Sequence, residues 1–149
     1  MAFKCPLARF EALGACGLLL WGGLTIGVAF IGTPAKFLAP TLTLPVALDV
    51  GRHTFAIYNE VELVLVVALA VIALRTSQPA VLRALILPAA IVLSETFWLI
   101  PALDVRVAAI LAGQQMPPSH LHFVYVAVEA AKTMALIVLG GRLVLLRDR

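Results

Sequence analysis

Four long apolar stretches separated by short polar segments decide what this chain can fold into. Each is close to the about 20 residues that a helix needs to cross the ~30 Å hydrocarbon core of a membrane. An isolated strand cannot satisfy its backbone groups in lipid, so each stretch is expected to be helical. The sequence therefore predicts an all-α integral membrane protein, a single-domain up-down bundle of four transmembrane helices. The helices, including extensions beyond the membrane on one side, are predicted at residues 12–31, 46–75, 81–113 and 120–146.

Composition excludes an ordinary soluble domain. Of the 149 residues, 62% are apolar and 13% are charged, whereas soluble domains carry about 25% charged residues. In water, such a chain would leave a large apolar surface uncovered. The basic residues are scattered and form no basic face, so the net charge of +3 does not indicate a nucleic-acid partner. The lipid bilayer is the expected environment.

The distribution of lysine and arginine predicts the orientation. One side of the predicted bundle holds seven flanking basic residues and the other holds three: Lys4, Arg9, Arg75, Arg83, Arg142, Arg147 and Arg149 against Lys36, Arg52 and Arg106. The side richer in lysine and arginine usually faces the cytoplasm. We therefore expect a multi-pass protein of the cell (inner) membrane with both termini cytoplasmic. The longer segments on the other side predict helical extensions outside the membrane.

Charged side chains within the apolar stretches mark the candidate site. Each costs about 2.5–3.5 kcal/mol to insert near the bilayer centre, so its presence needs a reason. On the fourth helix, four polar residues are spaced i, i+3, i+7 and i+10, so they fall within an arc of about 80° on one face. They are His122, Tyr125, Glu129 and Lys132. Residues 60 and 62 lie about 200° apart on a helix, so one of them is expected to face inward. The predicted ligand- or ion-binding residues of the outer half are Glu60, Glu62, Glu95, His122, Tyr125, Glu129 and Lys132.

Two interpretations of these charges stay open. Glu95 or Glu129 could pair with Lys132 as a buried salt bridge that fixes the helix arrangement. Alternatively, three or four carboxylates against one lysine leave surplus acid, which must hold protons or a cation. The second interpretation leads to the predicted function: a membrane protein that binds or relays a proton, a cation or a small polar ligand, with a role in transport.

Three histidines, His53, His120 and His122, fall at the predicted outer edge and are weak metal-ligand candidates. His53 and His122 could also hold a haem between two helices, which would make the chain a haem- or quinone-linked redox protein. The alternative is that these imidazoles lie in the lipid headgroup region. The sequence contains no hydrolase, zinc-protease or phosphate-loop motif. No catalytic residue is predicted. A non-enzymatic role is the leading interpretation, and the sequence leaves enzymatic activity open.

Glycines crowd the first helix, and Gly23 with Gly27 forms a G-x-x-x-G pair that permits close helix approach. The pair could pack within one bundle, which we favour, or form a face for another protein. The second alternative predicts a homo-oligomer, or a structural or accessory subunit of a membrane complex.

Short motifs spread over most of the chain resemble those of a known family. They are Trp21-Gly22-Gly23, Thr33-Pro34-Ala35-Lys36-Phe37, Asp49-Val50-Gly51-Arg52 through Phe55, Leu99-Ile100-Pro101, and His122-Phe123-Val124-Tyr125 with Glu129 and Lys132. This layout resembles the transmembrane protein 205 family and, more distantly, copper-resistance-D-like membrane proteins. The resemblance implies a four-helix bundle with an undefined role, connected with metal or drug tolerance. Some distant relatives are thought to bind haem or copper through membrane histidines and methionines.

Overall fold

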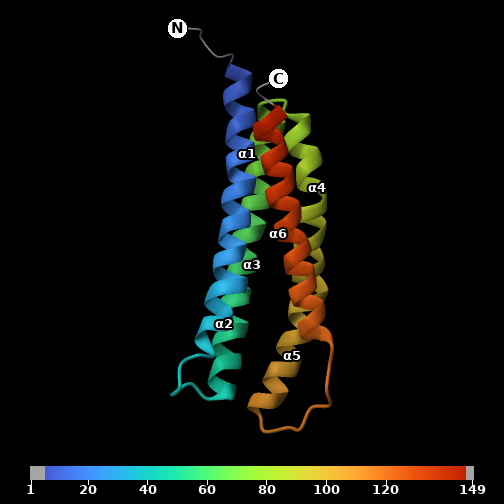
Figure 1. The fold of residues 1–149 in the computed structure, drawn as a ribbon. Coiled ribbons are helices and arrows are strands. Elements are labelled where there is room, and N and C mark those ends of the chain that lie inside the picture. Colours follow the sequence, from blue (N-terminus) through green and yellow to red (C-terminus); the bar gives the residue numbers. More distant parts are fainter. Residues whose placement is uncertain (1–5, 147–149) are drawn as a thin grey trace.

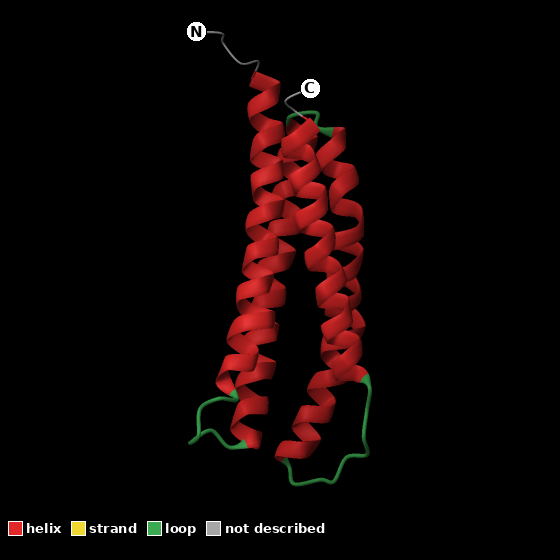
Figure 2. Cartoon of the chain, viewed as in Figure 1, coloured by secondary structure: helices red, strands yellow, loops and turns green. Residues whose placement is uncertain are grey.

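The computed structural model describes residues 6–146, and within that range it contains helices and no strand (Figures 1 and 2). Lys4, Arg147 and Arg149, which contribute to the predicted orientation, lie outside the described residues. The elements in chain order are α1 (Pro6–Thr25), η1 (Ile26–Gly32), α2 (Thr33–Lys36), α3 (Leu44–Arg75), α4 (Pro79–Ser94), η2 (Glu95–Leu99), α5 (Ile100–Leu111) and α6 (Leu121–Leu146).

Four continuous helical runs are long and apolar enough to cross a membrane. They are Phe10–Lys36, Leu44–Arg75, Pro79–Leu111 and Leu121–Leu145. Their outward surfaces carry large apolar side chains, among them Leu20, Phe97 and Leu145, which are 73%, 78% and 72% exposed. Lipid solvates such a surface, whereas water does not. The chain is therefore a multi-pass membrane protein by the length and composition of its helices.

The bundle has two different ends (Figure 1). At one, which we call the turn end, a short turn joins α3 to α4, and α1 begins and α6 ends close by. Ser77 adopts a positive φ of 53° in this turn, which reverses the chain. At the other, the loop end, lie α2, α5 and the two longer loops. Towards the turn end the helices pack around a buried apolar core that includes Leu18, Leu69, Val81, Val92 and Leu136.

Two stretches of π-helix widen the first and third runs. Directly after η1, the backbone N–H of Thr33 donates to the carbonyl oxygen of Val28. Directly after η2, the backbone N–H of Ile100 donates to the carbonyl oxygen of Glu95. Both acceptors lie five residues back, which is the π-helical pattern. Each is followed by a proline, Pro34 or Pro101, which has no N–H and whose ring crowds the preceding turn. A π segment accommodates this disruption without ending the helix.

The predicted end of the first helix at residue 31 is therefore wrong. We expected Pro34 to lie in a loop, but the helical run continues through η1 and α2 to Lys36. The run also begins earlier than residue 12, at Pro6. The third run ends at Leu111 rather than 113, before Gly113, whose φ is +77°.

The glycines of the first helix divide into two sets. Gly14 and Gly17 face neighbouring helices so closely that a Cβ atom would lie 2.7 Å from Val81 Cγ2 or 2.5 Å from Leu69 Cδ2. Gly23 and Gly27 have nothing within 4 Å of such a Cβ atom. The favoured interpretation, in which the G-x-x-x-G pair packs inside the bundle, is therefore wrong. The pair faces outward because the inward face is taken by other residues, including Trp21 and Thr25.

Substituting Gly14 by alanine is expected to destabilise the protein by about 1–3 kcal/mol relative to Gly23→Ala, because overpacking a tight contact displaces its neighbours. Val81 is buried and β-branched, so its side chain has little freedom to move aside. Reversible unfolding of both variants in bicelles measures the difference. Equal stabilities would contradict the close approach of α1 and α4.

Candidate functional site: a buried carboxylate–lysine cluster

Lys132 forms ion pairs with three glutamates deep inside the bundle. Its Nζ is 2.8 Å from both carboxylate oxygens of Glu62, 2.6 Å from Glu95 Oε2 and 3.2 Å from Glu129 Oε1. All four side chains are at most 1% exposed. We call Glu62, Glu95, Glu129 and Lys132 the carboxylate–lysine cluster. With every group ionised, three carboxylates and one ammonium carry a net charge of −2.

The three carboxylates differ in how fully they are hydrogen-bonded. Glu62 accepts a further bond from the indole Nε1 of Trp21 at 2.9 Å, and Glu129 accepts one from the Tyr125 hydroxyl at 2.7 Å. Two buried carboxylate oxygens, Glu95 Oε1 and Glu129 Oε2, have no hydrogen-bond partner among residues 6–146. Such oxygens are uncommon because an unsatisfied buried polar atom destabilises the fold. The cluster thus has two unpartnered carboxylate oxygens and, when fully ionised, two surplus negative charges.

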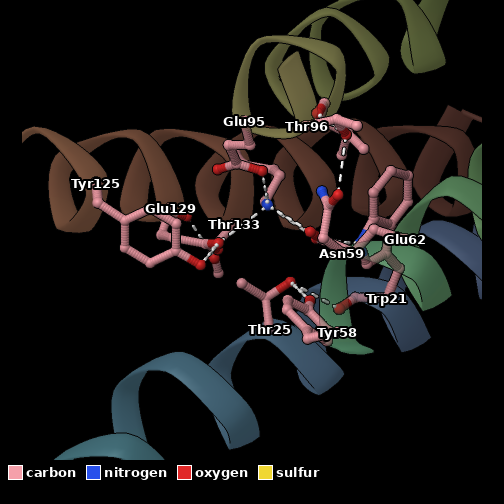
Figure 3. A network of polar contacts seen from close by, with 12 residues as sticks. Trp21, Thr25, Tyr58, Asn59, Glu62, Glu95, Thr96, Tyr125, Glu129 and Thr133 are labelled. Carbon is pink, nitrogen blue, oxygen red and sulfur yellow. Dashed lines mark hydrogen bonds and ion pairs between the residues drawn. The ribbon is translucent and has the colours of Figure 1, made fainter. Parts of the chain in front are cut away.

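A second layer of polar side chains surrounds the cluster (Figure 3). Thr25 on α1 and Tyr58 on α3 share a hydrogen bond of 2.6 Å, and the Tyr58 ring centroid lies 5.8 Å from Lys132 Nζ. The Thr96 hydroxyl on η2 donates to Asn59 Oδ1 on α3 at 2.9 Å. All four helical runs thus contribute to one buried polar network.

The cluster has the donor set of a cation site, but its centre is filled. One oxygen from each of the three glutamates lies within 4.8 Å of the others, and carboxylates suit hard cations. The ammonium of Lys132 occupies the space between these oxygens at 2.6–3.2 Å. A metal ion would have to displace it. A proton needs no such displacement, so the geometry favours protons over metal ions.

A cavity of 410 Å³ opens between the two halves of the bundle at the loop end. Tyr125, from its wall, makes the hydrogen bond to Glu129 and so connects the cavity to the cluster. The cavity is lined by Thr33, Lys36, Phe37, Leu48, Gly51, Arg52, His53, Phe55, Ala56, Ile100, Leu103, Asp104, Val107, His122 and Tyr125.

The structure brings most of the predicted acidic and basic residues together and separates one from them. Glu62, Glu95, Glu129 and Lys132 meet, with Tyr125 beside them. Glu60 is exposed on the outside of α3, since it lies about 200° around the helix from Glu62. Glu60 is therefore not part of the cluster.

The histidines lie apart from the cluster. His53 and His122 are exposed and line the cavity, while the exposed His120 lies outside it. The ring of His53 contacts its own helix through Asp49, with Nδ1 2.9 Å from the carbonyl oxygen. Among the described residues, the glutamate trio is the one group of three or more candidate ligands with metal-binding spacing, and it contains no histidine. Haem ligation by His53 and His122 stays a prediction.

Several residues of the site are absent from the sequence-based prediction: Trp21, Thr25, Lys36, Arg52, Tyr58, Asn59, Thr96 and Asp104. One signal could have identified Tyr58. Tyr58 precedes Glu62 by four residues, as Tyr125 precedes Glu129, so the pattern Tyr-x-x-x-Glu occurs in both helices. The remaining residues carry no comparable spacing.

Comparisons with protein-family models, curated proteins and solved structures give no match to this chain. The resemblance to the transmembrane protein 205 family therefore stays a prediction. What the fold and site define is a class: a multi-pass helical membrane protein with a buried carboxylate–lysine cluster beside a cavity.

Proposed function

We propose that this chain is a membrane protein that takes up and releases protons at the carboxylate–lysine cluster, through the cavity. The observation that carries the proposal is the equality between the surplus charge of −2 and the two carboxylate oxygens without a partner, on Glu95 and Glu129. A net charge of −2 in apolar surroundings is strongly unfavourable. Two protons on these oxygens would neutralise it, leaving one carboxylate paired with the Lys132 ammonium.

Tyr125 supports access from the cavity. Its hydroxyl donates to Glu129 Oε1, and the same residue forms part of the cavity wall. A hydroxyl can accept one proton while donating another, so it can pass a proton between cavity water and Glu129 Oε1. Rotation of the carboxyl group would then bring that proton to the Oε2 position. Glu129 in turn shares Lys132 with Glu95 and Glu62. Towards the turn end, the apolar core separates the cluster from solvent, so the proposed access is from one side.

The same proposal includes the orientation. We place the loop end, with α2 and α5, outside the cell and the turn end in the cytoplasm of an up-down bundle in the inner membrane. The surplus of lysine and arginine at the turn end supports this placement. The cluster would then be loaded from the outside.

The first experiment measures protonated carboxyl groups directly. The protein in nanodiscs is compared in acidic and alkaline buffer by infrared difference spectroscopy, which separates the C=O stretch of a carboxylic acid from carboxylate bands. We expect pH-dependent bands from two buried carboxyls, assigned through Glu95→Gln and Glu129→Gln. Glu60→Gln identifies the signal of the exposed glutamate. Spectra in which neither cluster variant removes a band would overturn the proposal and favour a purely architectural ion pair.

Replacing Tyr125 by phenylalanine is expected to slow hydrogen–deuterium exchange of the Glu129 carboxyl by a factor of about three to ten. The substitution removes the hydroxyl that connects Glu129 to the cavity but keeps the ring and its edge contact with Phe55. Exchange is followed by the isotope shift of the carboxyl band after transfer to D₂O. Tyr58→Phe is the matched control, since its hydroxyl bonds to Thr25 and the residue does not belong to the lining of the cavity. Equal slowing in both variants would rule out the route through Tyr125.

An accessory role in a larger membrane assembly is a second candidate. One observation favours it: the outward-facing Gly23 and Gly27, which leave space for close approach of another helix. Native mass spectrometry of the protein released from nanodiscs tests this role, and a monomer without a partner would count against it.

A further inference from the structure

The cavity is lined by charged and polar side chains as well as by apolar ones. Lys36, at the end of α2, and Arg52, on α3, bring positive charge to it, and Asp104 on α5 brings negative charge. Arg52 is already engaged, with Nε 3.4 Å from Asp49 and 3.5 Å from Asp104. Among the described side chains, no carboxylate forms an ion pair with Lys36, whose ammonium instead lies 5.2 Å from the Phe37 ring centroid. Lys36 is therefore the cation of the lining that has no carboxylate partner among the described residues, whereas Arg52 has two.

Gly51 makes room for this ammonium. A Cβ atom at position 51 would lie 2.5 Å from Lys36 Nζ, and among the described residues Lys36 is the one it would meet within 4 Å outside its own stretch of helix. The ammonium thus occupies the space that a side chain on α3 would fill, against the cavity wall. The end of α2 and the first half of α3 meet at this point to place a positive charge beside an apolar space.

The rest of the lining is suited to a hydrocarbon or aromatic body. Leu48, Phe55, Ala56, Ile100 and Leu103 contribute apolar surface. A volume of 410 Å³ lies in the range of about 300–1,000 Å³ that small-molecule pockets occupy. The cavity volume equals the liquid volume of about 14 water molecules. Since a water molecule has one non-hydrogen atom, a ligand that fills the cavity has on the order of 10–15 of them.

We infer that the cavity binds a small anionic amphiphile, a molecule with one acidic head group at Lys36 and an apolar body between α3 and α5. Charge complementarity selects the head group, and the lining selects the body. A salt-bridged ammonium and carboxylate form a strong, charge-assisted hydrogen bond. This inference does not depend on protons at the cluster, because neither Lys36 nor the apolar wall belongs to it.

Octanoate, with ten non-hydrogen atoms, is the probe, and 1-octanol is its uncharged counterpart; the octanoate carboxyl is ionised at neutral pH. Binding of the radiolabelled compounds to nanodisc-embedded protein is measured by equilibrium dialysis, with empty nanodiscs subtracted. We expect octanoate to bind more tightly than 1-octanol. Lys36→Met should lower octanoate affinity about tenfold and leave 1-octanol unchanged. Equal affinity of the wild-type protein for both probes would overturn the inference.

Two further substitutions separate the site from general effects on folding. Gly51→Ala displaces only the flexible end of Lys36, so it should weaken octanoate selectively in a folded protein. Ala56→Phe fills the cavity and should abolish binding of both probes. Its matched control is Ala68→Phe, on the exposed surface of the same helix and outside the cavity. Unchanged octanoate binding in Ala56→Phe would place the probe elsewhere and contradict the inference.

The anionic ligand could be a fatty acid taken from the bilayer or an acid dissolved in water. A fatty acid retained in native mass spectra of protein purified from membranes would identify a lipid source. Binding of both octanoate and the water-soluble benzoate, with no retained lipid, would identify a dissolved acid. Either result supports the site. A protein that retains no acid and binds neither probe would exclude it.

Discussion

Replacing Lys132 by methionine is expected to destabilise the protein by about 3–5 kcal/mol, the usual effect of removing one partner from a buried ion pair. The substitution leaves three carboxylates within a few ångströms of each other without their shared cation. Methionine fits the volume but donates no hydrogen bond, so Glu62, Glu95 and Glu129 all lose their ammonium contact. Few single substitutions in this chain should have a larger effect.

Reversible unfolding in bicelles, titrated with SDS, measures this change. Lys36→Met is the matched control: its ammonium has no carboxylate partner among the described residues, so its effect should stay within about 0.5 kcal/mol. Adding Glu62→Gln, Glu95→Gln and Glu129→Gln to Lys132→Met removes the uncompensated charge and should restore much of the stability. If Lys132→Met alone lowers the free energy of unfolding by less than about 1 kcal/mol, the ammonium is not needed to stabilise the three buried carboxylates.

The part of this architecture that follows from sequence is the part that depends on helix geometry alone. Length and apolarity predict four spanning helices, because each must satisfy its own backbone groups in lipid. The inward face of α6 is likewise predictable from spacing, since Tyr125, Glu129 and Lys132 recur with the helical period. Charged groups on that face turn inward because lipid cannot solvate them.

What the sequence could not provide depends on how helices rotate against one another. Spacing shows that either Glu60 or Glu62 faces inward, but not which; packing of α3 against α1, where Trp21 donates to Glu62, decides it. Gly23 and Gly27 match a packing motif yet face outward, because Trp21 and Thr25 occupy the inward face of the same turns. The cavity depends on Lys36 and Asp104, which come from separate runs.

The π segments illustrate a third limit. Pro34 and Pro101 are visible in the sequence, but a proline after an apolar run more often indicates the end of a helix than a widened turn. Here both helices continue beyond their prolines and carry residues of the cavity, including Lys36 and Asp104.

Glu129→Gln is expected to reduce the number of protons that each protein molecule takes up on acidification by about one. Two unpartnered oxygens, Glu95 Oε1 and Glu129 Oε2, are the proposed proton positions, and an amide at 129 can hold none. The double variant Glu95→Gln/Glu129→Gln should take up about two fewer protons than the wild type. A pH-indicator dye outside nanodisc-embedded protein, calibrated with known acid additions, counts them.

This count separates the two interpretations of the cluster more directly than a stability measurement does. An architectural salt bridge also predicts that variants lose stability, but it predicts no pH-dependent occupancy of Glu95 and Glu129. Glutamine keeps the shape of the side chain and an oxygen that can accept from Tyr125, so folding can be checked independently by thermal unfolding. Glu60→Gln, which removes an exposed carboxyl on α3, controls for the loss of any acidic group. If the cluster variants and the wild type take up equal numbers of protons, the cluster is permanently neutralised or permanently charged. In either case it fixes the helices without exchanging protons, and the inferred anion site at Lys36 would remain as the function of the cavity.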